Sequence, residues 1–225
     1  MSTEVHRHLD QELDALRDAV LRLGGEAEAA LQRAMDSLAN RNTEEAREVL
    51  EHDDAIDQLE VEVDRRAIDI FALRQPAARD LRFVMSVTKM APVLERIADH
   101  ACNIARAAID LNDEPELNNH IRIQEMGEIA SSMLARALDA FTRGDAGAAR
   151  EVINRDAEIN SLYNQIFHDL IELMAKEPST ATRDARLLFV AKHLERIGDY
   201  VTDICEMTVF MAEAAIIKHS HRDDS

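Results

Sequence analysis

Two similar segments place paired carboxylates on a helical face. The chain reads LERIAD at one point and LERIGD one hundred residues later, so that Glu95 precedes Asp99 and Glu195 precedes Asp199 by four positions. Residues four apart lie on the same face of an α-helix. Two anions held side by side repel each other, which predicts that a positive group compensates each pair. That group could be an arginine or a metal ion.

Further acids are expected at the height of the first pair. The chain should turn back at Gln75, because the proline that follows disfavours helical torsions in the residue before it. Asp53 and Asp57 lie 22 and 18 residues before this turn, and Glu95 and Asp99 lie 20 and 24 residues after it. Both arms of a helical hairpin rise equally per residue. The spacing therefore predicts one cluster of four carboxylates.

The second half repeats this arrangement around a turn near Glu177. Asp156 lies 21 residues before that turn, and the second Glu/Asp pair lies 18 and 22 residues after it. Asn160 stands where the first half has Asp57, and Asp203 adds an acid one helical turn beyond the pair. The second cluster is thus predicted to carry a slightly different donor set.

Carboxylate clusters without Cys or His are hard oxygen donors, which suit Mg²⁺, Mn²⁺, Ca²⁺ or iron, with several ions bridged by shared carboxylates as one form. The ordinary alternative is that Arg96 and Arg196, which follow the two glutamates, neutralise them. A di-iron site of the ferritin type is disfavoured, because the Glu-x-x-His pairs it needs are missing from the sequence. No phosphate loop, nucleophile elbow or Cys/His dyad is visible, so we predict no catalytic residue.

Composition restricts the class of protein. The 225 residues include only 6 Gly, 4 Pro and 4% aromatics, and the net charge is −18. Such a negative charge argues against binding to nucleic acid or anionic lipid. Cys102 and Cys205 form no metal-binding spacing and are expected to be buried. Without a signal peptide or an apolar run of membrane-spanning length, the chain is expected to be soluble and cytoplasmic.

An internal repeat predicts an all-α fold of two tandem, similar three-helix bundles. AREV occurs twice with an offset of 103, and landmarks around both copies recur at offsets of 100 to 104. We expect the first bundle within residues 1–113 and the second within 114–225, ending in a short polar tail. The six long helices are expected at 4–40, 43–74, 77–111, 116–143, 146–176 and 179–219. Their apolar seams include Val49, Ile56, Val63 and Ile70, repeated as Val152, Ile159, Ile166 and Leu173.

Residues 70–105 and 185–206, with the Gln-Pro turn and both LERI(A/G)D segments, resemble the two signatures of the PhoU family of bacterial phosphate-signalling regulators. The resemblance implies two three-helix bundles, a homodimer, and divalent or ferric ions (iron, zinc, manganese or magnesium), with multinuclear centres as one form. Departures from the family pattern are Ala98, for the usual glycine, and Asn160, for an acid. Together with the spacing, the resemblance gives these metal candidates: Asp53, Asp57, Glu95, Asp99, Asp156, Glu195, Asp199 and Asp203.

The resemblance also implies a regulatory, non-enzymatic function. PhoU-like proteins link the ATPase subunit of a phosphate ABC transporter to a sensor histidine kinase, and they repress the phosphate-starvation response and phosphate uptake. Contact with a membrane would then come only through these partners. The alternative that the carboxylates leave open is a metal-dependent enzyme such as a phosphoester hydrolase.

Overall fold

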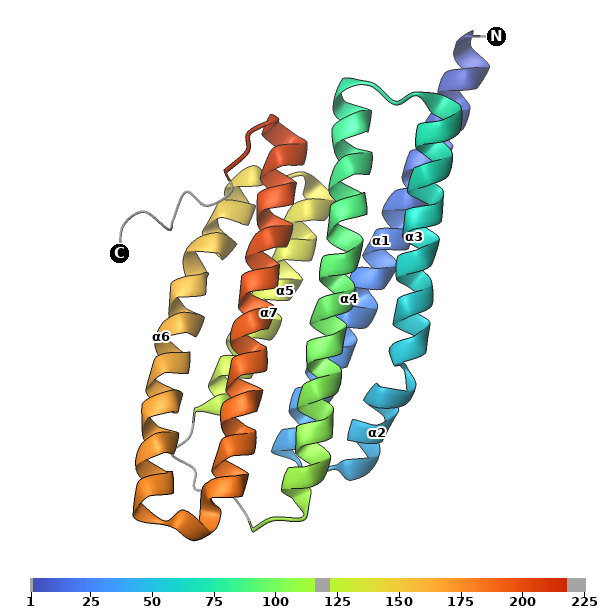
Figure 1. Ribbon diagram of the computed structural model, residues 1–225. Coiled ribbons are helices and arrows are strands. Elements are labelled where there is room, and N and C mark those ends of the chain that lie inside the picture. The colour runs from blue at the N-terminus through green and yellow to red at the C-terminus, as the bar shows by residue number, and fades with distance from the viewer. Residues whose placement is uncertain (1, 116–121, 218–225) are drawn as a thin grey trace.

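Seven α-helices and one 3₁₀ turn make up the described residues, 2–115 and 122–217, of this computed structural model, and no strand occurs among them (Figure 1). The predicted all-α class is confirmed, and the predicted polar tail after residue 217 lies outside the described residues. In chain order the elements are α1 (Ser2–Ala39), α2 (Thr43–Glu51), α3 (Asp53–Arg74), α4 (Ala78–Asn112), α5 (Ile123–Arg143), α6 (Ala146–Lys176), the 3₁₀ turn (Pro178–Thr180) and α7 (Ala181–Glu213).

The helix predicted over 43–74 is interrupted at His52, so the prediction of one unbroken helix was wrong. The His52 N–H bonds to the carbonyls of both Glu48 (3.2 Å) and Val49 (3.3 Å), and Ala55 bonds back to His52 over three residues. Two aspartates follow at once, and acids favour the first turn of a new helix. Asp53 therefore lies at the start of α3 and not inside a long helix.

Other boundaries lie close to the predictions. Asn42 caps α2, since its side chain accepts the N–H of Glu45, and α3 ends before Gln75, whose φ of 51° is left-handed. The last helix ends at Glu213 rather than at 219, because Ala214 also adopts a left-handed conformation. The described part of the fifth helix begins at Ile123; residues 116–121, where we expected its start, lie outside the described residues.

Four helices lie side by side in the order α3, α4, α7 and α6, with α1 and α5 behind them (Figure 1). The central helices α4 and α7 run antiparallel: Ser86 bonds to the carbonyl of Met207, and Arg82 bonds to that of Met211, each at 3.4 Å. This register brings the middle of one LER segment level with the middle of the other. The two repeats therefore meet at the level of both motifs.

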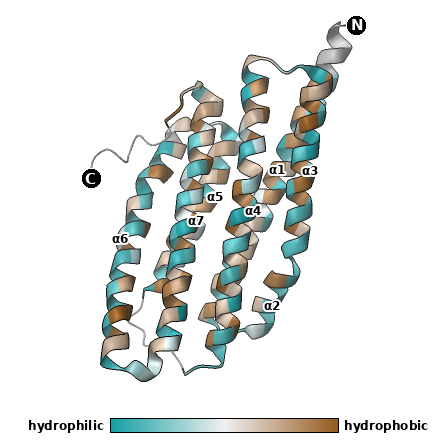
Figure 2. Ribbon diagram, viewed as in Figure 1, coloured by the Kyte–Doolittle hydropathy of each residue, from teal (hydrophilic) through white to brown (hydrophobic). Residues whose placement is uncertain are grey.

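The core is one continuous cluster of apolar side chains that spans both repeats. Of the eight seam positions, seven are buried and Leu173 is partly buried. Both cysteines are buried and free, as predicted. Hydrophilic residues follow the outward faces of the helices (Figure 2). The proposed division at residue 113, directly after α4, stays a prediction.

Candidate functional site

The first acidic cluster consists of Asp53, Asp57 and Glu60 on α3 with Glu95 and Asp99 on α4. The Asp57 carboxylate is close enough to be repelled by those of Asp53 and Asp99. The Glu95 carboxylate is likewise repelled by those of Asp99, Glu60 and Asp57. The Cys102 thiol donates a hydrogen bond to Oδ1 of Asp53, with 3.3 Å between sulfur and oxygen. The four acids predicted from spacing therefore do lie together, and Glu60 joins them.

Positive charge is scarce in the first acidic cluster. Burial, followed by repulsion from Asp99, Glu60 and Asp57, raises the pKa of Glu95 from 4.5 to about 7, and Arg96 opposes this only in part. Burial first and neighbouring aspartates second also raise the pKa of Asp57. Arg96, which directly follows Glu95, thus does not neutralise the cluster. This argues against the alternative that an arginine, rather than a metal ion, compensates the acids of the first repeat.

The second acidic cluster consists of Asp156 and Asn160 on α6 with Glu195 and Asp199 on α7. Two basic residues compensate it in part. Lys192 pairs with Glu195 at 2.6 Å, and Arg196 pairs with Asp199 at 3.3 Å. Pro92 stands at the position of Lys192 in the first repeat. The two clusters are therefore alike in backbone position and unlike in charge balance.

Asp156 has an unpaired oxygen. Its Oδ2 accepts the Asn160 amide at 2.7 Å, whereas Oδ1 is buried and has no hydrogen-bond partner among the described residues. A Cβ built on Gly198 would lie 3.2 Å from this Oδ1. The lack of a side chain at Gly198 therefore lets α7 pack close to the Asp156 carboxylate. Burial first, and then Asp199, raise the pKa of Asp156. A buried anionic oxygen without a donor is a position that a cation would stabilise.

A histidine pair links the two clusters across the α4–α7 interface. Nδ1 of His100 and Nδ1 of His193 are 2.8 Å apart and share one hydrogen bond, and His100 stacks on Tyr200. Burial, followed by the neighbouring His100, lowers the pKa of His193 to about 4. Burial likewise lowers the pKa of His100, although the nearby Asp99 opposes it. Both rings are thus neutral at neutral pH.

Sequence reasoning missed Glu60, Lys192 and this histidine pair. Glu60 lies three residues after Asp57 and shares its helical face, so the spacing could have revealed it. The histidines occupy unmatched positions in the repeat, and their meeting depends on the register between α4 and α7. Asp203, which we predicted as a metal candidate, lies one turn beyond the cluster, on a cavity of about 150 Å³ shared with Lys89.

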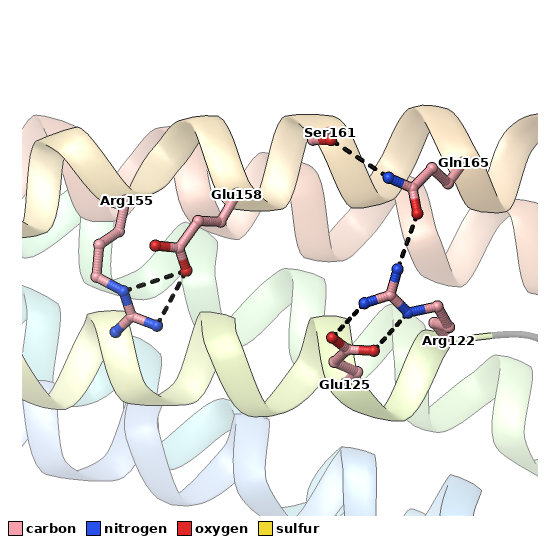
Figure 3. A network of polar contacts seen from close by, with 6 residues as sticks. All are labelled: Arg122, Glu125, Arg155, Glu158, Ser161 and Gln165. Atoms are coloured by element: carbon pink, nitrogen blue, oxygen red, sulfur yellow. Dashed lines mark hydrogen bonds and ion pairs between the residues drawn. The ribbon is translucent and has the colours of Figure 1, made fainter.

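Several acids elsewhere on the surface pair with arginine. On α6, Arg155 pairs with Glu158 at 3.3 Å (Figure 3). Beside α5, Arg122 pairs with Glu125 and also donates to Gln165 at 2.8 Å. These exposed pairs contrast with the first acidic cluster, in which acid faces acid.

The donor chemistry of the first cluster fits a hard cation, because its oxygens are anionic, crowded and short of donors. In the second cluster, Oδ1 of Asp156 is the buried oxygen for which the described residues supply no donor. In the described part of the chain, no group of three or more His, Cys, Asp or Glu side chains is already placed to hold an ion. The side chains would therefore have to converge when a cation binds. Metal ligation by these residues stays a prediction.

Comparisons with known proteins identify the family to which this chain is similar. A family model described as the PhoU domain matches residues 20–108 and 123–208. The chain is 37% identical to the "Phosphate-specific transport system accessory protein PhoU homolog" of Aquifex aeolicus, over 95% of this chain and 96% of that protein. It is 32% identical to the homologue from Pseudomonas aeruginosa, over 97% of this chain and 91% of that protein.

Solved structures show the same fold. The crystal structure of PhoU from Pseudomonas aeruginosa superimposes with a TM-score of 0.89 at 33% identity, covering 92% of this chain and 99% of that one. The phosphate transport system regulatory protein PhoU from Streptococcus pneumoniae gives 0.86 at 30% identity, covering 92% and 98%. Within residues 2–115 and 122–217, no helix has the length and apolar character that a membrane crossing requires.

Proposed function

The chain belongs to the PhoU family, and from this premise we propose that it is an accessory regulator of phosphate transport. In this proposal it represses phosphate uptake and the phosphate-starvation genes when phosphate is plentiful. The observation that carries the proposal is the match to named phosphate-transport accessory proteins over both repeats and nearly the full chain. It acts by binding, as an adaptor between a transporter ATPase and a sensor histidine kinase, and not by catalysis.

Metal binding is the second part of the proposal. Asp53, Asp57, Glu95 and Asp99 would hold one centre, and the predicted acids of the second repeat would hold the other. The ion could be iron, zinc, manganese or magnesium, and it would supply positive charge that neutralises the crowded carboxylates. The raised pKa of Glu95 and the unpaired oxygen of Asp156 support this part.

Partner proteins, rather than nucleic acid, are the proposed targets. A net charge of −18 repels phosphate backbones and anionic lipid alike, so membrane contact would be indirect. Long helices present extended faces to other proteins. We also propose a cytoplasmic homodimer, as the family resemblance implies.

A genetic experiment tests the adaptor function. Deleting the gene should leave a phosphate-starvation reporter on in phosphate-rich medium, and the wild-type chain should restore repression. A chain with Glu95→Gln and Asp99→Asn should repress less and should recover less of the ATPase and kinase in affinity capture. The matched control, Glu125→Gln with Glu158→Gln, removes two acids from arginine-paired positions and should repress normally. Full repression without the gene would contradict the proposal.

One observation favours the alternative of a metal-dependent hydrolase. A carboxyl group with a pKa near 7, as at Glu95, is suited to general acid–base catalysis. Phosphoester turnover by the metal-loaded chain that disappears in Glu95→Gln would establish this function. If such turnover and repression were always lost together among folded variants, the adaptor proposal would be wrong.

A further inference from the structure

Arg41 and Gly144 are equivalent positions in the two repeats. Each follows the first helix of its repeat and adopts a left-handed conformation, with φ of 54° and 64°. Each precedes a capping residue, Asn42 or Asp145, whose side chain accepts an N–H three residues later. Their numbers differ by 103, the main offset of the sequence repeat. The backbone is therefore the same at both positions, and only the side chain differs.

In the first repeat, the Arg41 side chain closes the end of α4. Its Nη2 donates to the carbonyl oxygens of Leu111 (3.4 Å), Asn112 (2.6 Å) and Glu114. The last carbonyls of a helix lack intrahelical donors and form the negative end of its dipole. The left-handed conformation costs a non-glycine residue about 1–2 kcal/mol, and these charge-assisted bonds offset that cost.

In the second repeat, a cavity of about 540 Å³ lies beside the equivalent position, Gly144. Its wall includes Met211 and Ala212 at the end of α7, which are the counterparts of Leu111 and Asn112. A Cβ built on Gly144 would meet nothing within 4 Å. The helix end that a guanidinium closes in one repeat is thus bordered by open space in the other.

The carbonyls at this end of α7 retain capacity for a donor. The Met211 carbonyl receives one long bond, 3.4 Å, from Arg82. A carbonyl oxygen has two lone pairs and can accept a second hydrogen bond. The negative end of the α7 dipole adds to the attraction of a cation.

Charged side chains on the cavity wall also favour a cation. Asp10, Asp14 and Asp80 lie there with three arginines. Two of those arginines already have acidic partners, since Arg17 pairs with Asp14 at 3.1 Å and Arg143 pairs with Asp139 at 2.7 Å. The third, Arg79, lines the cavity without an acidic partner among the described residues. Asp10 and Asp80 also line it, so the charges left over from these pairs sum to one negative charge.

The equivalent of Asp80 shows what a closed site looks like. Asp184 is fully buried, pairs with Arg183 at 3.1 Å and accepts the Thr180 hydroxyl at 2.6 Å. Asp80 is only partly buried and lines the cavity. The Arg-Asp sequence of the second repeat therefore forms a buried ion pair, whereas that of the first repeat lines the cavity.

We propose that this cavity receives an arginine side chain from a partner protein, which does for α7 what Arg41 does for α4. A polypeptide fits better than a small guanidinium compound, because the cavity exceeds one guanidinium and its lining includes apolar side chains as well as charged ones. Phe83 and Phe141 stack there with ring centres 6.2 Å apart. Because the Arg17 guanidinium lies over the Phe83 ring, 4.9 Å from its centre, Phe141 would contact the residue beside the arginine. The inference deepens the adaptor function and rests on it only for the existence of a partner.

A substitution tests whether the site accepts a guanidinium. Gly144→Arg and Gly144→Gln carry the same left-handed strain and similar length, but only the first provides a guanidinium. We expect the Gly144→Arg protein to melt roughly 2–4 °C above Gly144→Gln, the shift that one favourable interaction produces in a chain of this size. Equal melting temperatures, or a lower one for Gly144→Arg, would overturn the proposal.

Titrations of the purified full chain, followed by NMR of the backbone amides, test the occupant. N-acetyl-Leu-Arg-amide should shift the amides of Gly144, Met211 and Ala212, and N-acetyl-Leu-Lys-amide should bind about tenfold more weakly, the loss of one charge-assisted hydrogen bond. Gly144→Arg should abolish both effects. Free arginine binding as tightly as the dipeptide, or inorganic phosphate shifting these amides in place of it, would overturn the proposal. Because no metal or phosphate signalling enters this assay, its failure would leave the proposed regulatory function standing.

Discussion

Replacing Glu95 by glutamine should stabilise the metal-free protein at pH 8 and change it little at pH 5. In the folded chain, burial and three neighbouring acids raise the pKa of Glu95 from 4.5 to about 7. Below 4.5 the group is protonated in both folded and unfolded states, and no penalty exists. As pH rises toward 7, the unfolded state ionises first, and the folded state loses stability.

The magnitude follows from the two pKa values. A difference between 4.5 and about 7 corresponds to about 3 kcal/mol before solvent screening. Glu95 is only partly buried, so solvent screens much of this energy, and we expect about 1 kcal/mol at pH 8. Glutamine keeps the size and the hydrogen-bonding capacity of the side chain while removing its charge.

Urea unfolding in the presence of a chelator measures this difference. The free energy of unfolding of Glu95→Gln minus that of the wild type should be near zero at pH 5 and about +1 kcal/mol at pH 8. Glu195→Gln is the matched control, because Glu195 pairs with Lys192 at 2.6 Å. That variant should be slightly less stable than the wild type at pH 8.

A Glu95→Gln protein that gained no stability between pH 5 and pH 8 would refute the reasoning, because the acids would then not be repelling one another. An equal gain in Glu195→Gln would show that the effect comes from net charge and not from the first acidic cluster.

Three further predictions concern the rest of the molecule. Because the pKa of His193 is lowered to about 4 in the folded chain, protonation of this ring favours unfolding. The free energy of unfolding of the wild type should therefore fall by roughly 1–2 kcal/mol as pH falls from 6.5 to 4. His193→Gln, compared by urea midpoints, should lack this loss. The second acidic cluster should bind Mn²⁺ several-fold more weakly than the first in calorimetric titrations of variants with one Glu/Asp pair neutralised, because Asn160 replaces the anionic Asp57; equal or tighter binding would contradict this. Arg41→Gly should lower the free energy of unfolding by about 1 kcal/mol in chemical denaturation. The charge-assisted bonds from Arg41 to the carbonyls of Leu111 and Asn112 would be lost, and this loss outweighs the relief of the left-handed conformation. An unchanged value would show that these carbonyl contacts add nothing to stability.

The helix ends and the acid clusters could be predicted because they depend on local rules. A proline after Gln75 stops a helix, and the constant rise per residue then sets Asp53 and Asp57 level with the acids of the returning arm. These arguments hold within one helical hairpin, where the turn fixes the register.

Features that depend on packing between the repeats escaped prediction. The contact between His100 and His193 requires the antiparallel register of α4 and α7, which no spacing within one repeat specifies. The break at His52 reflects competition between carbonyls three and four residues back, a small local difference that apolar periodicity does not reveal. Asp203 was assigned to the second cluster from helical spacing alone; it also lines a cavity with Lys89, and its role as a metal ligand stays a prediction.

Elemental analysis of the protein purified without a metal-binding tag tests the metal proposal most directly. We expect at least one bound ion per acidic cluster in the wild type. Glu95→Gln with Asp99→Asn should lose the share of the first cluster, and Glu125→Gln with Glu158→Gln should lose none. A wild-type chain without metal after equilibration with iron, zinc, manganese and magnesium, or the same metal content in all three proteins, would contradict the account.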